Sequence, residues 1–343
     1  MMEKQYDLVA LGEVMLRLDP GDSRIAHART FSVWEGGGEY NVAKAFASCF
    51  GLRSAVVTAL ADNPVGSLIR NLITAGGTDT RWLKTVPYDG TGIAVRNGLN
   101  FTERGFGMRA PLGCSDRGNS AASRICPDDF DWDQIFSEAK IFHTGGIFAS
   151  LSESTAATVR ESVAAARKRG VPVSFDINYR PSLWKSRGGR EAAAAFFEKI
   201  IPDVDYLFGS EEDYALMEGL RTIAFPDALR AVTLRYPQLK GAGASCRTVI
   251  STSHNRWQCY YADADGVYKS RVYDTEIFDR VGGGDGFVSG FLAAVCGGQD
   301  AQTAVEWGAA HGALVMSTPG DTSMATAAEV SALAAGCERR IRR

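Results

Sequence analysis

Three consecutive glycines followed by an aspartate, Gly282-Gly283-Gly284-Asp285, stand near the C-terminal end of the chain. Glycines lack a Cβ atom, so a turn made of them can present several backbone N–H groups to one anion. The apolar stretch 287–296 predicts a helix, and the unpaired N–H groups of its first turn add a partial positive charge at the same point. We therefore expect an anion-binding turn at residues 282–284.

Asp285 is unexpected at such a turn because a carboxylate repels an anion. A general base that takes a proton from an attacking hydroxyl group would explain its presence, as in phosphoryl transfer. For the glycine run alone, a tight turn without any ligand is the alternative.

A second triplet, Gly36-Gly37-Gly38, precedes a segment of helical periodicity, 39–50, that ends at Gly51. In open parallel sheets the ligand lies beyond the carboxyl ends of the strands, where loops enter helices. Both triplets precede helices, so we expect them to form the two ends of one site. Neither is followed by the GKS or GKT of a nucleotide P-loop, and the absence of GxGxxG after a strand argues against a nicotinamide dehydrogenase.

Apolar strands and amphipathic helices alternate regularly from residue 141 onward, which predicts an α/β fold with a doubly wound, mostly parallel sheet. Shorter strands at 247–251, 257–261 and 267–272 predict an antiparallel edge. The polar alternating segments, about 13–36 and 90–120, predict an inserted elaboration. The other expected strands are 6–11, 54–60, 141–144, 171–176 and 206–208, with a further alternating run at 91–100, and the expected helices are 39–50, 63–75, 153–169, 190–200, 211–219, 284–296, 301–316 and 325–341.

The composition is typical of a globular protein that acts on small molecules. The hydrophobic content is 45% and the net charge is -3 among 343 residues, so there is no general attraction to nucleic acid or to an anionic membrane. No apolar run reaches about 18 residues, and the N-terminus lacks a signal-peptide core, so we expect a cytoplasmic protein. The seven cysteines include no CxxC pair, which indicates reduced thiols, and Cys246, His254 and Cys259 match no zinc-binding spacing.

Two motifs resemble the signatures of the PfkB, or ribokinase-like, carbohydrate kinases: Gly36-Gly37-Gly38-Glu39-Tyr40-Asn41-Val42-Ala43 and Asp279-Arg280-Val281-Gly282-Gly283-Gly284-Asp285. Residues 12–18, 176–180 and Trp184 are similar to the 2-keto-3-deoxygluconate kinases within that family. The resemblance spans essentially the whole chain. It implies a three-layer α/β/α core over residues 1–343 and a small β-sheet lid built from about 13–36 and 90–120.

The resemblance also implies roles on the sugar side of the site. Asp285 would be the catalytic base, Gly282, Gly283 and Gly284 the anion hole, and Gly37, Gly38 and Asn41 substrate-binding positions. Arg117 and Arg180 match positions that face the substrate, where a guanidinium group can bind a carboxylate through two hydrogen bonds. Solvated loop arginines are the alternative for both. Arg17 and Asp19 either face the sugar or lie on a plain exterior of an edge strand.

On the nucleotide side the resemblance is weaker. It implies contacts to ATP from Ser210, Ser253, His254, Gly284 and Gly320, and a water-mediated contact to Mg²⁺ from Asp213. Ser210-Glu211-Glu212-Asp213 stands where many members have Asn-x-x-Glu, and the loop 251–257 replaces a Lys-x-Gly-x-x-Gly turn. His254 could be a phosphate donor or a turn residue, and His311 is expected to be a packed core histidine. A requirement for a monovalent cation is left open.

The function implied is an ATP-dependent kinase that phosphorylates the primary hydroxyl of a sugar acid. The specific expectation is conversion of 2-keto-3-deoxygluconate to its 6-phosphate by a homodimer joined through the β-lid. A kinase for a neutral ketose such as fructose is one alternative. A catalytically silent sugar-sensing protein on the same fold is the other.

Overall fold

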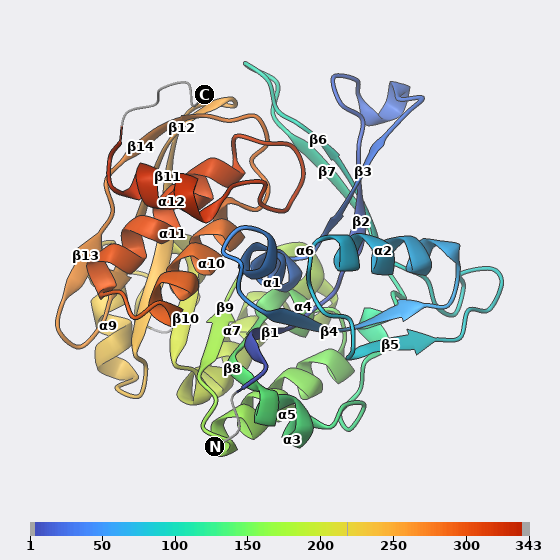
Figure 1. Ribbon diagram of the computed structural model, residues 1–343, viewed down its shortest axis with the longest axis horizontal. Coiled ribbons are helices and arrows are strands. Elements are labelled where there is room, and N and C mark those ends of the chain that lie inside the picture. Colours follow the sequence, from blue (N-terminus) through green and yellow to red (C-terminus); the bar gives the residue numbers. More distant parts are fainter. Residues whose placement is uncertain (1–3, 218, 338–343) are drawn as a thin grey trace.

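The computed structural model describes residues 4–217 and 219–337, and within them a main sheet of ten strands runs through the molecule (Figure 1). Its order is β13-β12-β11-β10-β9-β8-β1-β4-β5, and β14 also pairs with β12. Neighbouring strands are parallel from β5 to β11, whereas β12 runs antiparallel to β11, β13 and β14. The predicted doubly wound sheet with an antiparallel edge is confirmed. The strands are β1 (Tyr6–Leu11), β4 (Ser54–Ala61), β5 (Leu83–Val86), β8 (Ala139–Gly145), β9 (Val173–Asp176), β10 (Tyr206–Ser210), β11 (Gly241–Ser251), β12 (His254–Ala262), β13 (Val267–Lys269) and β14 (Tyr273–Glu276).

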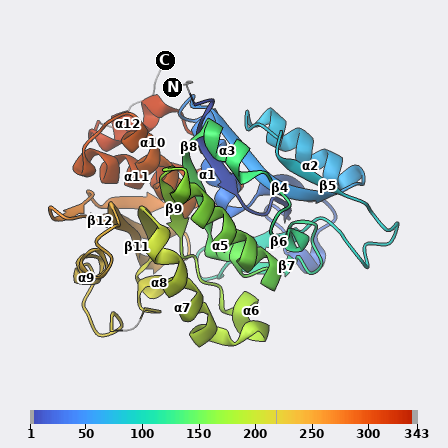
Figure 2. The same ribbon diagram turned by 90° about the horizontal axis from the view of Figure 1, so that it is seen from below.

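Helices cover both faces of this sheet, because its central strands are apolar on both faces. In β1, Val9 and Leu11 belong to one buried cluster, while Leu8 and Ala10 belong to the other. Figure 2 shows α1, α10 and α11 on one side of the sheet and α5, α7 and α9 on the other. The helices of the first layer are α1 (Gly38–Ser48), α2 (Pro64–Ala75), α10 (Gly283–Cys296), α11 (Ala301–Val315) and α12 (Ala327–Ala334), and those of the second include α3 (Trp132–Glu138), α5 (Glu153–Lys168), α7 (Gly189–Ile200) and α9 (Asp227–Arg235).

A smaller second sheet stands beside the upper ends of the main strands in Figure 1. Its order is β3-β2-β6-β7, with β2 and β6 parallel and the outer pairs antiparallel. The strands are β2 (Met15–Asp19), β3 (Ser32–Gly36), β6 (Leu99–Glu103) and β7 (Leu112–Asp116). All four fall inside the two polar alternating segments.

Several predicted boundaries are wrong for local reasons. Residues 91–94 form a bend rather than a strand, because the carboxylate of Asp89 accepts the backbone N–H groups of Thr91, Gly92 and Ala94, and regular pairing begins only at Leu99. α8 (Glu211–Tyr214) is one turn long instead of reaching residue 219. The segment 251–257 is mostly strand, since Ser251 already pairs with His254 across a tight hairpin. α12 ends at Ala334, and residues 338–341 of the expected final helix lie outside the described part.

The structure adds simple findings on cysteines and membrane segments. None of the seven cysteines forms a disulfide within residues 4–217 and 219–337. In that same part of the chain, no helix combines the length and apolar character that crossing a bilayer requires.

Candidate active site

The order of the main sheet places a crevice where β1 lies between β4 and β8. The chain moves from β1 to β4 and β5 on one side and later fills β8, β9 and β10 on the other, so connections diverge at β1. Ligands in open α/β sheets bind at such a switch point, beyond the carboxyl ends of the strands. The segments at the ends of β1, β8 and β9 approach the first turn of α1 there, because Cβ atoms added to Gly12 and Gly145 would meet Glu39, and one added to Gly38 would lie 3.6 Å from Asn178 Nδ2.

Asp285 lies in the first turn of α10 and is held by the first turn of α1. Asn41 Nδ2 donates to Asp285 Oδ2 at 2.6 Å, and Asn41 Oδ1 accepts the backbone N–H of Gly37 at 3.3 Å. A Cβ atom added to Gly38 would lie 3.6 Å from Asp285 Oδ1, so the chain passes close to this carboxylate. Asn41 therefore fixes the orientation of Asp285, a role that the sequence did not indicate.

The two glycine triplets meet at Asp321, in the loop that follows α11. A Cβ atom on Gly36 would lie 2.4 Å from Asp321 Oδ2, and one on Gly282 would lie 2.2 Å from the Asp321 carbonyl oxygen. Gly282 also has a φ of +81°, which disfavours any side chain. Both glycines are thus required by close approach, and the structure brings the two triplets into one place.

Burial and neighbouring carboxylates raise the pKa values of the acidic side chains in this crevice. The pKa of Asp285 is raised to about 6, chiefly by burial; the hydrogen bond from Asn41 and the charge of Arg180 oppose the rise, and the charge of Asp321 adds to it. Burial also raises the pKa of Glu39 to about 7 and the pKa of Asp176 well above its usual range, with Asp213 and Asp285 adding to the latter. A carboxyl group with a pKa near 6 is suited to accept a proton at neutral pH.

Arg117 is not a solvated loop arginine, so that alternative is wrong. Its side chain is 12% exposed and forms an ion pair with Glu13, which follows β1. Arg117 Nε and Glu13 Oε1 are buried without a hydrogen-bond partner among the described residues. The pair can therefore still offer one donor and one acceptor, although its charges cancel.

Arg180 lies at the end of the loop after β9, immediately before α6 (Pro181–Trp184), and is exposed. Its Nη1 donates to the carbonyl of Tyr179 at 3.1 Å. The backbone N–H of Tyr179 in turn donates to Asp213 Oδ1 at 2.8 Å, which ties this loop to the start of α8. The three residues and Ser210 line a cleft of about 330 Å³.

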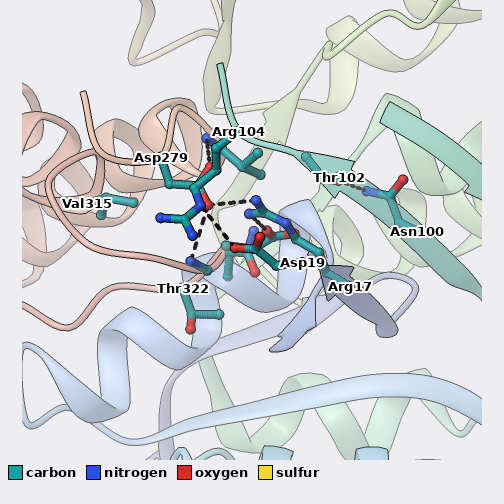
Figure 3. A network of polar contacts seen from close by, with 12 residues as sticks. Arg17, Asp19, Asn100, Thr102, Arg104, Asp279, Val315 and Thr322 are labelled. Carbon is teal, nitrogen blue, oxygen red and sulfur yellow. Dashed lines mark hydrogen bonds and ion pairs between the residues drawn. The ribbon is translucent and has the colours of Figure 1, made fainter. Parts of the chain in front are cut away.

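Arg17 and Asp19 do not lie on an exterior edge, so that alternative is wrong. β2 is an inner strand of the second sheet, and both side chains are buried. Figure 3 shows them with Arg104 beside Asp279, at the beginning of the second glycine motif. Arg17 Nη1 and Nη2 donate to Asp321 Oδ1 and Asp279 Oδ2, both at 2.6 Å.

On the expected nucleotide side, three residues have protein partners. His254 Nε2 contacts Asp274 Oδ1 across the β12–β14 pair, and the carbonyl of Ser253 accepts the N–H of Ile277 at 2.8 Å. Gly320 is buried, and a Cβ atom there would lie 3.0 Å from the ring of Trp34. Contacts of these residues to a nucleotide stay a prediction. His311 is fully buried and bonds to Ser289 and Ser323, which confirms it as a packed core histidine.

The geometry of the two glycine turns agrees with the comparison to known families. The pfkB family carbohydrate kinase model matches residues 5–328. The chain belongs to the pfkB family of carbohydrate kinases. A 2-dehydro-3-deoxygalactonokinase of Haloferax volcanii is 31% identical over 96% of this chain and 97% of its own length.

Two further similarities support the same family. A 5-dehydro-2-deoxygluconokinase of Shouchella clausii is 26% identical, covering 96% of each chain. The crystal structure of a 2-dehydro-3-deoxygluconokinase from Thermotoga maritima superposes with a TM-score of 0.88 at 32% identity, over 96% of this chain and 99% of that one. The named substrates differ, so family membership alone leaves the sugar open.

A pfkB kinase uses a nucleotide, and Mg²⁺ commonly accompanies nucleotide phosphates. Among the described residues, no three His, Cys, Asp or Glu side chains gather closely enough to hold a metal ion by themselves. Asp213 uses Oδ1 for Tyr179 and Oδ2 for the N–H of Ser210 at 2.7 Å. Because Mg²⁺ keeps several waters and needs only one or two carboxylates besides phosphates, Asp176 and Asp213 fit an ion that enters with the nucleotide.

Sequence reasoning missed several residues of this kinase site. Glu13 and Asn178 each stand two residues beyond the carboxyl end of a strand, β1 and β9, where site residues are expected, so their placement could have drawn attention to them. Asn178 also has a φ of +38°, and its Nδ2 donates to Asp176 Oδ2 at 3.3 Å. The resemblance placed Asp321, together with Gly320, in a loop on the adenine side, but its contacts with Arg17 and with both glycine motifs could not be foreseen, because they join segments that are distant in the sequence.

Proposed function

We propose that this pfkB kinase transfers the γ-phosphate of ATP to the primary hydroxyl of a sugar acid, and that 2-keto-3-deoxygluconate, converted to its 6-phosphate, is the preferred substrate. The relatives named above act on dehydro-deoxy sugars or sugar acids, and two of them share about a third of their residues with this chain. That similarity supports the substrate class.

The environment of Arg180 is the observation that supports specificity for a sugar acid. Its guanidinium group is exposed at the sheet end, and its positive charge acts on both Asp176 and Asp285. In residues 4–217 and 219–337, no carboxylate lies within ion-pair distance of it, unlike Arg117. A substrate carboxylate would supply that partner through two charge-assisted hydrogen bonds.

In the proposed mechanism Asp285 accepts the proton of the attacking hydroxyl. Asn41 holds the carboxylate that does so, and Gly37 and Gly38 let the sugar approach it closely. The N–H groups of Gly282, Gly283 and Gly284 stabilise the charge that develops on the transferring phosphoryl group. Mg²⁺, bound near Asp176 and Asp213, would neutralise the phosphates and leave the proton transfer to Asp285.

The second sheet is proposed to act as a lid and to join two copies. It excludes water from the transferring group when it covers the sugar. Val33 on edge strand β3 and Leu112 on edge strand β7 are 41% and 49% exposed, which supports a homodimer through this sheet.

A neutral ketose such as fructose is the second candidate substrate. The ion pair between Arg117 and Glu13 favours it, because it removes one of the two guanidinium groups that would otherwise require a substrate carboxylate. Glu13 Oε1 and Arg117 Nε would then bind hydroxyl groups of the sugar.

Release of ADP, measured by a coupled assay over a panel of sugar acids and neutral sugars, tests the proposal. We expect the highest kcat/KM on 2-keto-3-deoxygluconate or a close sugar acid. Turnover of fructose without turnover of any sugar acid would refute the acid specificity. No turnover on the whole panel would instead support the sugar-sensing alternative.

A further inference from the structure

Arg17 forms an ion triad that joins the second sheet to the second glycine motif. Its side chain is fully buried in β2, and its two terminal nitrogens each donate at 2.6 Å, one to Asp279 and the other to Asp321 (Figure 3). Arg17 Nε has no hydrogen-bond partner among the described residues. The guanidinium group is therefore oriented by the two carboxylates alone.

Each of the two carboxylate residues controls the backbone of the anion-binding turn. Asp279 Oδ1 accepts the N–H of Val281 at 3.3 Å, and Asp279 Oδ2 accepts the N–H of Gly320 at 3.4 Å. The carbonyl of Asp321 lies where a Cβ on Gly282 would meet it at 2.2 Å. A shift of either aspartate would move the N–H groups of residues 282–284.

A second contact from the same sheet reaches the adjoining segment. The guanidinium carbon of Arg104, just after β6, lies 4.6 Å from the centre of the Phe278 ring. Arg104 Nε also lies 3.3 Å from Asp19 Oδ2. The segment that enters the turn is thus held by the second sheet at two successive residues, Phe278 and Asp279.

The positive charge of Arg17 reduces the repulsion between the two buried carboxylates and any phosphate bound at the neighbouring turn. Asp279 and Asp321 are both buried, and without a cation they would repel a polyphosphate at the neighbouring turn. Stability alone does not explain the arrangement, because well-packed apolar residues often replace a buried ion group at no loss of stability. A fixed cation between the two carboxylates serves anion binding better than it serves folding.

We propose that Arg17 is a positioning residue for phosphoryl transfer, holding the 279–284 turn in its anion-binding shape and offsetting one of the two negative charges of Asp279 and Asp321. This inference rests on the proposed kinase function. Arg17 contacts neither sugar nor phosphate in this scheme, and it acts through the two aspartates. It also makes the turn depend on the second sheet, so that closure of the lid and the shape of the anion hole are coupled.

The test compares Arg17→Met, Arg17→Lys and the double variant R17M/D321N with the wild type, on whichever sugar the wild type phosphorylates. For Arg17→Met we expect kcat to fall about 10- to 100-fold, as for misplacement of a catalytic group by about 1 Å, and KM for ATP to rise. The double variant should recover part of the lost kcat, because one of the two uncancelled charges is gone. Arg17→Lys should keep KM for ATP near the wild-type value while lowering kcat, since an ammonium group cannot bridge both aspartates.

Arg24→Met is the matched control. Like Arg17, Arg24 forms an ion pair with a buried acid, in this case Glu103 of β6. The Arg24 side chain, however, is 50% exposed, and the pair lies away from the 279–284 turn. Arg24→Met should leave kcat and KM for ATP unchanged. Thermal unfolding of every variant is recorded with the kinetics, and if Arg17→Met does not fold, Arg17→Lys carries the comparison.

Folded Arg17→Met or Arg17→Lys with wild-type kcat would overturn the inference, and so would a double variant no better than Arg17→Met. Binding of ADP to each variant, measured by calorimetry, does not depend on turnover. If the wild type phosphorylates no sugar, the proposed function fails, whereas equal ADP affinity of wild type and Arg17→Met would refute the role of Arg17 by itself.

Discussion

The acid limb of the pH–rate profile is the property that the geometry around Asp285 predicts most sharply. A base must be deprotonated to accept the proton of the sugar hydroxyl, and kcat/KM for the sugar reports the ionisation of the enzyme form that has not yet bound the sugar. The pKa of Asp285 is raised from 3.8 to about 6, chiefly by burial. For a pKa near 6 the deprotonated fraction, and with it kcat/KM, rises about tenfold between pH 5 and pH 7. An aspartate at its ordinary value of 3.8 would change by less than about a tenth over that range.

Two variants should move this limb in opposite directions. Asn41 donates to the ionised carboxylate and so lowers the pKa of Asp285, whereas the charge of Asp321 raises it. Asn41→Ala should therefore shift the midpoint to higher pH and Asp321→Asn to lower pH. Each variant will also change the absolute rate, but the midpoint is the quantity compared.

The assay is initial ADP release at limiting sugar and saturating ATP, from pH 5 to pH 8.5, in buffers of constant ionic strength. Phosphate esters titrate near about pH 6 themselves, so ATP contributes to the profile in every variant alike. The difference in midpoint between variants is free of that contribution. Midpoints that coincide in wild type, Asn41→Ala and Asp321→Asn would refute the assignment of the limb to Asp285.

Two further predictions concern the glycine turn and the acid specificity. Gly282→Ala should lower both stability and kcat, because its Cβ would lie 2.2 Å from the carbonyl oxygen of Asp321. The loss of stability, measured by urea unfolding, should exceed the cost of about 1–2 kcal/mol that a left-handed alanine has by itself. Gly51→Ala is the control: Gly51 has a φ of +64° and open space around it, so this variant should show only the conformational cost and unchanged kinetics. Arg180→Ala should raise KM for a sugar acid about 10- to 100-fold, because a pair of charged hydrogen bonds is lost, and should change KM for a neutral sugar much less. Equal effects on both sugars would contradict a contact between Arg180 and a substrate carboxylate.

Much of the fold could be predicted because its strands and helices carry strong local patterns. β1 is an apolar run interrupted only by Asp7 that ends before a glycine, and α11 has both a capping aspartate at Asp300 and sustained apolar periodicity. Such signals depend on neighbours a few residues apart. The tight hairpin between β11 and β12 was harder to predict from the sequence, because only Thr252 and Ser253 separate the two strands. Neither residue is typical of a two-residue hairpin turn.

The polar network of the site could not be predicted in the same way. The ion pair between Arg117 and Glu13 joins residues 104 positions apart, and the ion pair between Arg17 and Asp321 joins residues 304 positions apart. Each partner looks like an ordinary charged residue until the fold brings it near the other. The glycine motifs could be recognised because close approach of the backbone leaves glycine as the residue that fits, whereas a buried ion pair leaves no comparable mark in the sequence.

Asp285→Asn tests the central claim most directly, since it keeps the size of the side chain and removes its ability to accept a proton. Phosphoryl transfer to the best sugar of the panel, followed by ADP release, and binding of the same sugar, followed by calorimetry, are measured on the same preparation. We predict that transfer is abolished while the sugar still binds nearly as in the wild type. A variant that binds the sugar and turns over at close to the wild-type rate would show that Asp285 is not the base.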